Sequence, residues 1–176
     1  MGAGKTTVGA RLAQRLGWRF ADSDHIVESL TRSTVAEIFE RQGESVFRAK
    51  EAAAIRHIAT EEQLVLALGG GAIELPATRE FLASLPACRV IFLEAPLEIL
   101  LSRCEQNPGG PVRPVLRDRA RLAERWEARL PLYRQAHLTL PTADRSPDDV
   151  VEAILTSLAV ELDPPGSPHR NPGVLA

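Results

Sequence analysis

The sequence predicts a single α/β domain of three layers, in which helices cover both faces of a mainly parallel sheet. Two observations carry this prediction. Short apolar runs alternate with stretches of helical periodicity along almost the whole chain, and the run at 64–68 is apolar at every position and ends at three glycines. A strand that is apolar throughout is typical of a parallel sheet buried on both faces. In such sheets ligands bind beyond the carboxyl ends of the strands.

Start and stop signals mark the elements of the first half. Apolar residues recur every four positions from Val8 to Leu16, and Gly17 follows as a helix stop. Thr34 and Glu37 form a capping box at the start of another helix. The predicted elements are a helix at about 5–16, a strand at 18–21, a helix that opens at Thr34 and closes at Gly43, an Ala-rich helix at about 45–59 and the strand at 64–68.

The second half continues the same alternation. Pro76 and Pro96 each stand where a first helical turn begins, and Ser146 caps a last helix whose first turn contains a proline and two acids. Residues 107–116, rich in Pro and Gly, are expected to form a long loop. The other predicted elements are a strand at 89–93, a charged helix at about 118–129, a weak strand at 137–140 and a disordered tail at 163–176, which leaves 1–162 as the domain.

Composition and charge narrow the class of protein. With 176 residues, 44% of them hydrophobic and 25% charged, the chain resembles one ordinary globular domain. A formal net charge of -2 gives no footprint for nucleic acid or for an anionic membrane surface. No apolar run approaches the ~20 residues of a membrane span, and no leader pattern precedes the first helix. We expect a monomeric cytoplasmic protein that binds neither nucleic acid nor membrane, with Cys88 and Cys104 as free thiols.

Residues 2–6, Gly-Ala-Gly-Lys-Thr, match the second half of the phosphate-binding pattern G-x-x-x-x-G-K-[ST]. Glycines let backbone N–H groups close on phosphates, Lys5 reaches the β- and γ-phosphates, and the Thr6 hydroxyl binds Mg²⁺. A Gly-Lys-Thr triplet is common by chance, but its place at the start of an amphipathic helix favours a nucleotide site. The residues assigned to ATP on this ground are Gly2, Ala3, Gly4, Lys5, Thr6 and Thr7.

Asp22 and Asp24 lie two residues apart where a strand is predicted to end. In an extended strand the two carboxylates share a face, so both approach a metal ion or a substrate hydroxyl. A solvated turn in which Asp24 caps the following helix explains the same pattern. The local sequence leaves both interpretations open.

The three glycines at 69–71 give up side chains where a buried strand ends. Such positions usually allow a close approach of the backbone to a ligand or to another strand, although a flexible turn is the alternative. Arginines are the other signal, and most single arginines are solvated surface charges. Arg113 stands out because its Pro- and Gly-rich loop can close over phosphates and bring a guanidinium to the transferring charge.

Together these motifs resemble those of the shikimate kinases, in the same order and spacing up to about residue 160. The matching segments are Gly-Lys-Thr at 4–6, Asp-Ser-Asp at 22–24, Phe-Arg at 47–48, the glycines at 69–71, Arg-Pro-Val-Leu at 113–116 and Arg-Leu-Pro-Leu-Tyr at 129–133. Gluconate and adenylate kinases share the loop and the fold but not the triple glycine with this set of arginines. The resemblance implies a P-loop kinase fold and the Mg²⁺-dependent phosphorylation of shikimate by ATP, on the route to chorismate and the aromatic amino acids.

The resemblance also implies a role for each residue. A small anionic acid is held by guanidinium forks, each of which matches a carboxylate in two parallel hydrogen bonds. The implied catalytic residues are Asp24, as the base, with Lys5 and Arg113, and the implied metal ligands are Thr6 and Asp22. Arg113 from the lid and Arg145 at the adenine end are implied to bind ATP. The residues implied around shikimate are Arg48 and Arg129 on its carboxylate, Gly70 against its ring, and Asp24, Gly69 and Gly71.

The chain departs from the resemblance at its start, because the first glycine of the loop and the apolar strand before it would precede Met1. That strand is expected at the centre of the sheet, so its loss would bare two strand edges and cost roughly 8–15 kcal/mol of apolar burial. We therefore expect that the natural protein is longer and active, and that Met1 is an internal methionine of it. The 176-residue chain is expected to fold weakly or to be inert. Two other functions stay open: another small-molecule P-loop kinase, such as a gluconate kinase-like enzyme, and a catalytically silent nucleotide-binding module.

Overall fold

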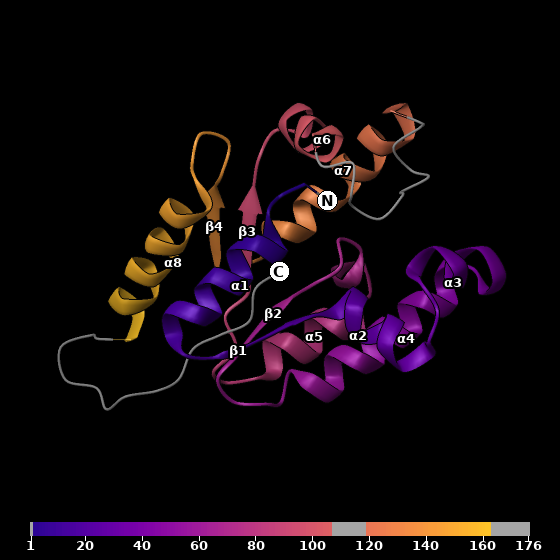
Figure 1. The fold of residues 1–176 in the computed structure, drawn as a ribbon, viewed down its shortest axis with the longest axis horizontal. Helices are drawn as coiled ribbons and strands as arrows, with labels where there is room; N and C mark the ends of the chain where they lie inside the picture. The colour runs from indigo at the N-terminus through magenta and orange to yellow at the C-terminus, as the bar shows by residue number, and fades with distance from the viewer. Residues whose placement is uncertain (1, 107–118, 163–176) are drawn as a thin grey trace.

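The computed structural model describes residues 2–106 and 119–162, and Figure 1 shows how their helices surround two pairs of strands. Strand β1 (Arg19–Asp22) pairs in parallel with β2 (Leu64–Ala67), and β3 (Ile91–Glu94) pairs in parallel with β4 (Leu138–Pro141). Within these described ranges the two pairs form separate sheets, so each strand has a single hydrogen-bonded partner. The predicted parallel pairing is confirmed, and the sheet is divided between the β1–β2 pair and the β3–β4 pair.

Helix α1 (Lys5–Leu16) packs on β1 and β2 and lies beside α8 (Pro147–Leu162) (Figure 1). Val8 and Leu12 of α1 belong to a buried cluster that also contains Val65 of β2, Leu93 of β3 and Ile154 of α8. Each side chain of this kind is worth about 1.5–3 kcal/mol when fully buried. One continuous core therefore joins the two sheets.

The other face of β2 is covered by α4 (Glu44–Ile58) and α5 (Pro76–Ser84). Leu64 and Leu66 point into this second cluster, with Ile55 of α4 and Leu82 of α5, whereas Val65 between them belongs to the first cluster. Successive side chains of a strand point to opposite faces, so β2 is buried on both. This alternation confirms the predicted three layers.

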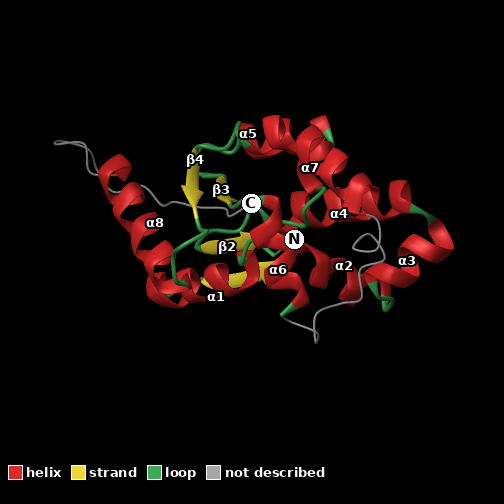
Figure 2. Ribbon diagram, turned by 90° about the horizontal axis from the view of Figure 1, so that it is seen from above, coloured by secondary structure: helices red, strands yellow, loops and turns green. Residues whose placement is uncertain are grey.

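Helices α2 (Ser23–Thr31) and α3 (Val35–Gln42) pack with α4 around a third cluster, and α3 lies at the edge of the molecule (Figure 2). The predicted capping box is present: Thr34 Oγ1 accepts a hydrogen bond from the Glu37 amide at 3.2 Å, and Glu37 accepts one from the Thr34 amide at 2.8 Å. Hydrogen bonds from Thr34 hold the pKa of Glu37 below its ordinary value. Gly43, with a φ of 86°, ends α3 as expected.

The remaining described elements are a 3₁₀ turn η1 (Ala72–Glu74), α6 (Leu97–Glu105) and α7 (Arg119–Tyr133). The predicted end of α7 at residue 129 is wrong, because the helix continues for one more turn and contains Pro131. A proline this close to the end removes a single N–H donor, and the Arg134 amide still bonds to the Leu130 carbonyl at 3.0 Å. The predicted loop at 107–116, with Arg113, and the tail at 163–176 lie outside the described residues.

Other predicted boundaries differ by one or two residues, as for the strand expected at 89–93 and found at Ile91–Glu94. In the part of the chain that the structure describes, no helix is both long and apolar enough to cross a membrane.

Cys88 and Cys104 are free thiols in different surroundings. Cys88 is buried, and burial raises its pKa to about 11. Because the thiolate is the reactive form, we expect Ellman's reagent at pH 8 to label Cys104 first and Cys88 only after unfolding. Peptide mapping after a short exposure, with and without urea, checks this order. Rapid labelling of Cys88 in the folded protein would contradict the burial seen here.

Candidate active site

The loop before α1 has the tight backbone that phosphate binding needs. Gly2 and Gly4 have φ angles of 68° and 84°, in the left-handed region that glycine tolerates best. A side chain at Gly2 would collide with the Leu100 carbonyl of α6 and would lie 3.1 Å from Cys104 Sγ. Lys5 opens α1 directly after this turn. The backbone N–H groups and the positive helix end therefore meet at one point, as an anion site requires.

Thr6 and Asp22 come together beside this loop. The Thr6 hydroxyl donates to Asp22 Oδ2 at 2.9 Å, and Asp22 Oδ1 accepts a hydrogen bond from the Asp24 amide at 3.0 Å. Asp22 is the last residue of β1 and the N-cap of α2, so one carboxylate fixes the strand end and faces Thr6. A hydroxyl and a carboxylate are oxygen ligands of the kind that Mg²⁺ prefers, with phosphates and waters as the others. The predicted pair Thr6 and Asp22 fits such an ion.

The prediction that Asp22 and Asp24 share a strand face is wrong, because the strand ends at Asp22 and Asp24 lies in the first turn of α2. The alternative, a cap by Asp24, is also wrong in its residue: the cap is Asp22. Within the described ranges, no group of three His, Cys, Asp or Glu side chains is arranged to hold a metal ion. The Asp24 carboxylate lies close to Gly69, beyond the end of β2.

The register of the β1–β2 pair brings the end of β2 close to the start of α2. Asp22 pairs with Ala67, so Ser23 meets Gly69, whose amide donates to Ser23 Oγ at 2.8 Å. A side chain at Gly69 would collide with Glu51 Oε1 and would lie 2.6 Å from Asp24 Oδ1. Because Gly69 has no side chain, the carboxylates of Glu51 and Asp24 can both lie against its backbone. The neighbours of Gly69 are these two carboxylates, whereas the close approach of a ligand or another strand stays a prediction. The turn is ordered by the Ala72 amide, which bonds to the Gly69 carbonyl at 3.0 Å.

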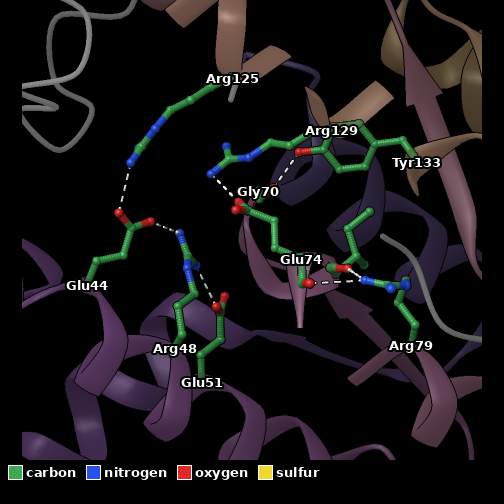
Figure 3. Close-up of polar contacts among 10 residues, drawn as sticks. Glu44, Arg48, Glu51, Gly70, Glu74, Arg79, Arg125, Arg129 and Tyr133 are labelled. Atoms are coloured by element: carbon green, nitrogen blue, oxygen red, sulfur yellow. Dashed lines mark hydrogen bonds and ion pairs between the residues drawn. The ribbon is translucent and has the colours of Figure 1, made fainter. Parts of the chain in front are cut away.

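Glu51 of α4 is the buried anchor of the site, with 1% of its surface exposed. Burial and the nearby Asp24 raise the pKa of Glu51, and Arg48 opposes them. Arg48 Nη1 bonds to Glu51 Oε2 at 2.6 Å, while Arg48 Nη2 lies 3.3 Å from Glu44 Oε1 (Figure 3). Burial lowers the pKa of Arg48, but the Glu51 and Glu44 carboxylates raise it further, so the guanidinium stays charged. Sequence reasoning missed Glu51, although its position three residues after Arg48 on one helix face was a signal.

Arg129 and Tyr133 reach the same glycines from α7. Tyr133 donates to the Gly70 carbonyl, and Arg129 Nη2 forms an ion pair with Glu74 Oε1 (Figure 3). The Tyr133 ring stacks on Phe92 of β3, with centroids 5.0 Å apart and planes 16° apart. One turn separates Arg129 from Tyr133, so the two side chains share a face of α7, and the extra turn of the helix supplies Tyr133. Sequence reasoning gave Tyr133 and Glu74 no role.

A small cavity of about 30 Å³ connects the loop with the glycines, and its lining includes Lys5, Gly69, Gly70, Trp126 and Tyr133. A larger cavity of about 310 Å³ lies between α5, β3 and the end of α7, and none of the predicted site residues lines it. We place the candidate site at the small cavity because Lys5 lines it together with Gly69 and Gly70, and the glycine segment is where the other charged groups gather.

Two predicted residues do not join this group. Arg113 lies outside the described residues, and Arg145 is exposed just before α8. None of the described hydrogen bonds or ion pairs connects Arg145 to the loop. The predicted residues that do come together are Gly2, Ala3, Gly4, Lys5, Thr6, Asp22, Asp24, Arg48, Gly69, Gly70, Gly71 and Arg129, and Thr7 follows Thr6 in the first turn of α1.

Comparison with known proteins places this geometry in context. A family model described as shikimate kinase matches residues 1–159. A shikimate kinase of Psychrobacter arcticus is 42% identical over 159 residues, which are 90% of this chain and 84% of the relative. One of Acinetobacter baumannii is 40% identical over 156 residues, 88% of this chain and 86% of the relative.

Solved structures give the same result. A shikimate kinase from Acinetobacter baumannii in complex with shikimate has a TM-score of 0.83 and 39% identity, over 92% of this chain and 89% of that one. The shikimate kinase from Bacteroides thetaiotaomicron has a TM-score of 0.81 and 29% identity, over 90% and 94%. The residues matched by the family model include all those of the candidate site.

Proposed function

The chain belongs to the shikimate kinase family, and from this membership we propose how its own residues divide the work of phosphoryl transfer. The reaction moves the γ-phosphoryl group of ATP to a hydroxyl of shikimate, in the presence of Mg²⁺, and leaves ADP and shikimate 3-phosphate. It serves aromatic amino-acid biosynthesis. The gluconate kinase-like and catalytically silent alternatives have no support in the matches described above. The observation that carries the proposal is the convergence of Arg48, Arg129 and Asp24 on the glycines beside the loop.

On the donor side, the backbone of residues 2–7 encloses the phosphates and Lys5 neutralises charge on the transferring group. Thr6 and Asp22, which already face each other, would hold the Mg²⁺ that offsets phosphate charge. Arg113 is assigned to the lid over ATP and Arg145 to the adenine end, on the resemblance alone. Catalysis at this side is positioning and charge neutralisation.

On the acceptor side, Asp24 accepts the proton of the attacking hydroxyl as the new O–P bond forms and the bond from the γ-phosphorus to ADP breaks. Arg48 and Arg129 bind the shikimate carboxylate, and Gly70 lies against the ring. Support for these roles comes from the position of Asp24 between the Asp22 end of β1 and Gly69. Further support comes from the small cavity, which is lined both by Lys5 of the loop and by Gly69 and Gly70.

We also propose that residues 1–162 act as one catalytic domain, as a monomer in the cytoplasm. The buried cluster that joins both sheets supports a single domain. The net charge of -2 supports a small-molecule enzyme rather than one that binds nucleic acid or membranes. Size-exclusion chromatography with light scattering tests the monomer.

Arg129→Ala and Arg48→Ala are expected to raise the KM for shikimate by about 10- to 100-fold each and to leave the KM for ATP within about twofold. Each variant loses charged hydrogen bonds worth about 1.5–3 kcal/mol, and 1.4 kcal/mol is a factor of ten. A coupled ADP-release assay with both substrates varied measures the effect.

The matched control is Arg134→Ala, which removes an arginine near the end of α7 that pairs with Glu94 and is 59% exposed. This control should leave both KM values unchanged. An unchanged KM for shikimate in Arg48→Ala and Arg129→Ala would show that the carboxylate is bound elsewhere.

A further inference from the structure

Arg48 and Arg129, which are proposed to bind the substrate carboxylate, both form ion pairs with glutamates of the same chain in this structure. Arg48 contacts Glu51 and Glu44, and Arg129 contacts Glu74. These partners differ in burial: Glu51 is 1% exposed, whereas the Glu44 and Glu74 side chains are 36% and 41% exposed. Glu51 is therefore a fixed part of the site, and the other two can turn toward solvent without leaving a buried gap.

Glu74 is the partner that blocks Arg129. The ion pair uses Arg129 Nη2, and this nitrogen belongs to both of the N–H pairs with which a guanidinium can form a fork on a carboxylate. A second carboxylate that approached either fork would meet the negative charge of Glu74. The substrate can form a full fork with Arg129 only when Glu74 has moved away.

The backbone of Glu74 is held by hydrogen bonds in which its side chain takes no part. Arg79 Nη1 donates to the Ile73 carbonyl at 2.6 Å and to the Glu74 carbonyl at 3.1 Å (Figure 3). The Glu74 amide also bonds to the Gly71 carbonyl at 3.0 Å, which closes the 3₁₀ turn. The carboxylate thus starts from a defined position and needs only side-chain rotation to leave it.

The position of the Glu74 carboxylate is that expected for the substrate's own. A side chain built at Gly71 would collide with the Arg48 guanidinium and would lie 2.8 Å from Glu74 Oε1. The space over Gly71 is therefore shared by Arg48 and by the carboxylate that occupies Arg129. A ligand carboxylate held by both arginines would have to enter this same space.

We propose that Glu74 is a displaceable internal carboxylate that occupies the substrate-carboxylate position on Arg129 and lowers the affinity for shikimate. This inference rests on the proposed function, because it requires that Arg129 bind the substrate. Each binding event exchanges one carboxylate for another on the same guanidinium. The cost of this exchange falls only on an acceptor that has a carboxylate, because an acceptor without one need not displace Glu74 from Arg129.

The test is Glu74→Gln, with KM and kcat for shikimate measured in the ADP-release assay and the Kd measured by calorimetry. Removal of the charge should lower KM and Kd by about two- to fivefold, the range of a partly exposed ion pair, with the change in KM rather than in kcat. Glu74→Ala should act in the same direction. Glu80→Gln, which removes the same charge from α5, takes part in none of the ion pairs among the described residues and should leave KM unchanged.

Two further measurements separate competition from a structural role. Glu74→Gln should have no effect in an Arg129→Ala background, and it should not improve the binding of methyl shikimate, which has no free carboxylate. A raised or unchanged KM in Glu74→Gln, with Arg129→Ala still raising it, would overturn the inference and leave the proposed function intact. If Arg129→Ala does not raise KM, the proposed site and this inference both fail.

Discussion

Asp24→Asn should lower kcat by about 100- to 10,000-fold and leave the KM for ATP within about twofold. The loss is that of a general base, because an amide has the shape of the carboxylate but cannot accept the proton of the attacking hydroxyl. Asp22 is the acid that accepts the hydrogen bond of Thr6, and this contact is kept in Asp24→Asn, so binding of the nucleotide should persist. Steady-state kinetics in both substrates measure the two effects separately.

The stability of the same variant provides a second measurement. Asp24 raises the pKa of the buried Glu51 because the two negative charges lie near each other, although burial contributes more. Removal of the Asp24 charge relieves this repulsion, so the melting temperature of Asp24→Asn should be equal to or higher than that of the parent protein. The combination of lower turnover with undiminished stability identifies a functional charge.

Asp144→Asn, at an exposed position between β4 and α8, is the control and should alter neither quantity. Equal losses of turnover and of ATP affinity in Asp24→Asn would contradict the proposed base. So would a turnover close to that of the parent protein.

Gly69→Ala is expected to destabilise the protein by about 3 kcal/mol and to remove most of its activity. The added methyl group would enter the space of Glu51 Oε1 and would lie 2.6 Å from Asp24 Oδ1. Glu51 cannot move aside cheaply, because it is buried and bonded to Arg48 at 2.6 Å. Overpacking of a core costs about 1–3 kcal/mol, and disturbance of a buried charge pair adds to it.

For a domain of this size the destabilisation corresponds to a fall in melting temperature of roughly 6–12 °C, which differential scanning calorimetry measures. Gly17→Ala is a matched control, because a side chain there meets nothing within 4 Å and only its φ of 69° is unfavourable. The control should cost about 1 kcal/mol and leave kcat unchanged. If the two variants lose equal stability, the collision with Glu51 and Asp24 is not the cause.

The two predictions separate the parts played by neighbouring groups. Asp24→Asn removes a charge and keeps the packing, whereas Gly69→Ala keeps the charges and displaces them. Loss of activity in both, with loss of stability only in the second, is the pattern expected if Glu51 and Gly69 hold Asp24 and Arg48 in position.

Local patterns were sufficient for most of the fold. Helix α1 begins and ends at the predicted residues, and α3 has the predicted capping box and glycine stop, because caps and left-handed glycines are decided within one helical turn. The apolar run at 64–68 was correctly assigned to a strand buried on both faces. One boundary was wrong: the helix expected to end at about residue 129 continues to Tyr133, whose contacts with Phe92 and Gly70 favour another turn.

The sequence by itself determined the family chemistry of this protein: a phosphate-binding loop before a helix, paired acids, a triple glycine and a set of arginines, each recognisable because its residue types and spacing are local. Only the tertiary structure decided which groups meet. The parallel register of β1 and β2 brings Ser23 to Gly69, the extra turn of α7 brings Tyr133 to Gly70, and burial makes Glu51 the fixed partner of Arg48. These contacts join residues far apart in the chain, and no short pattern encodes which of several carboxylates a guanidinium will meet.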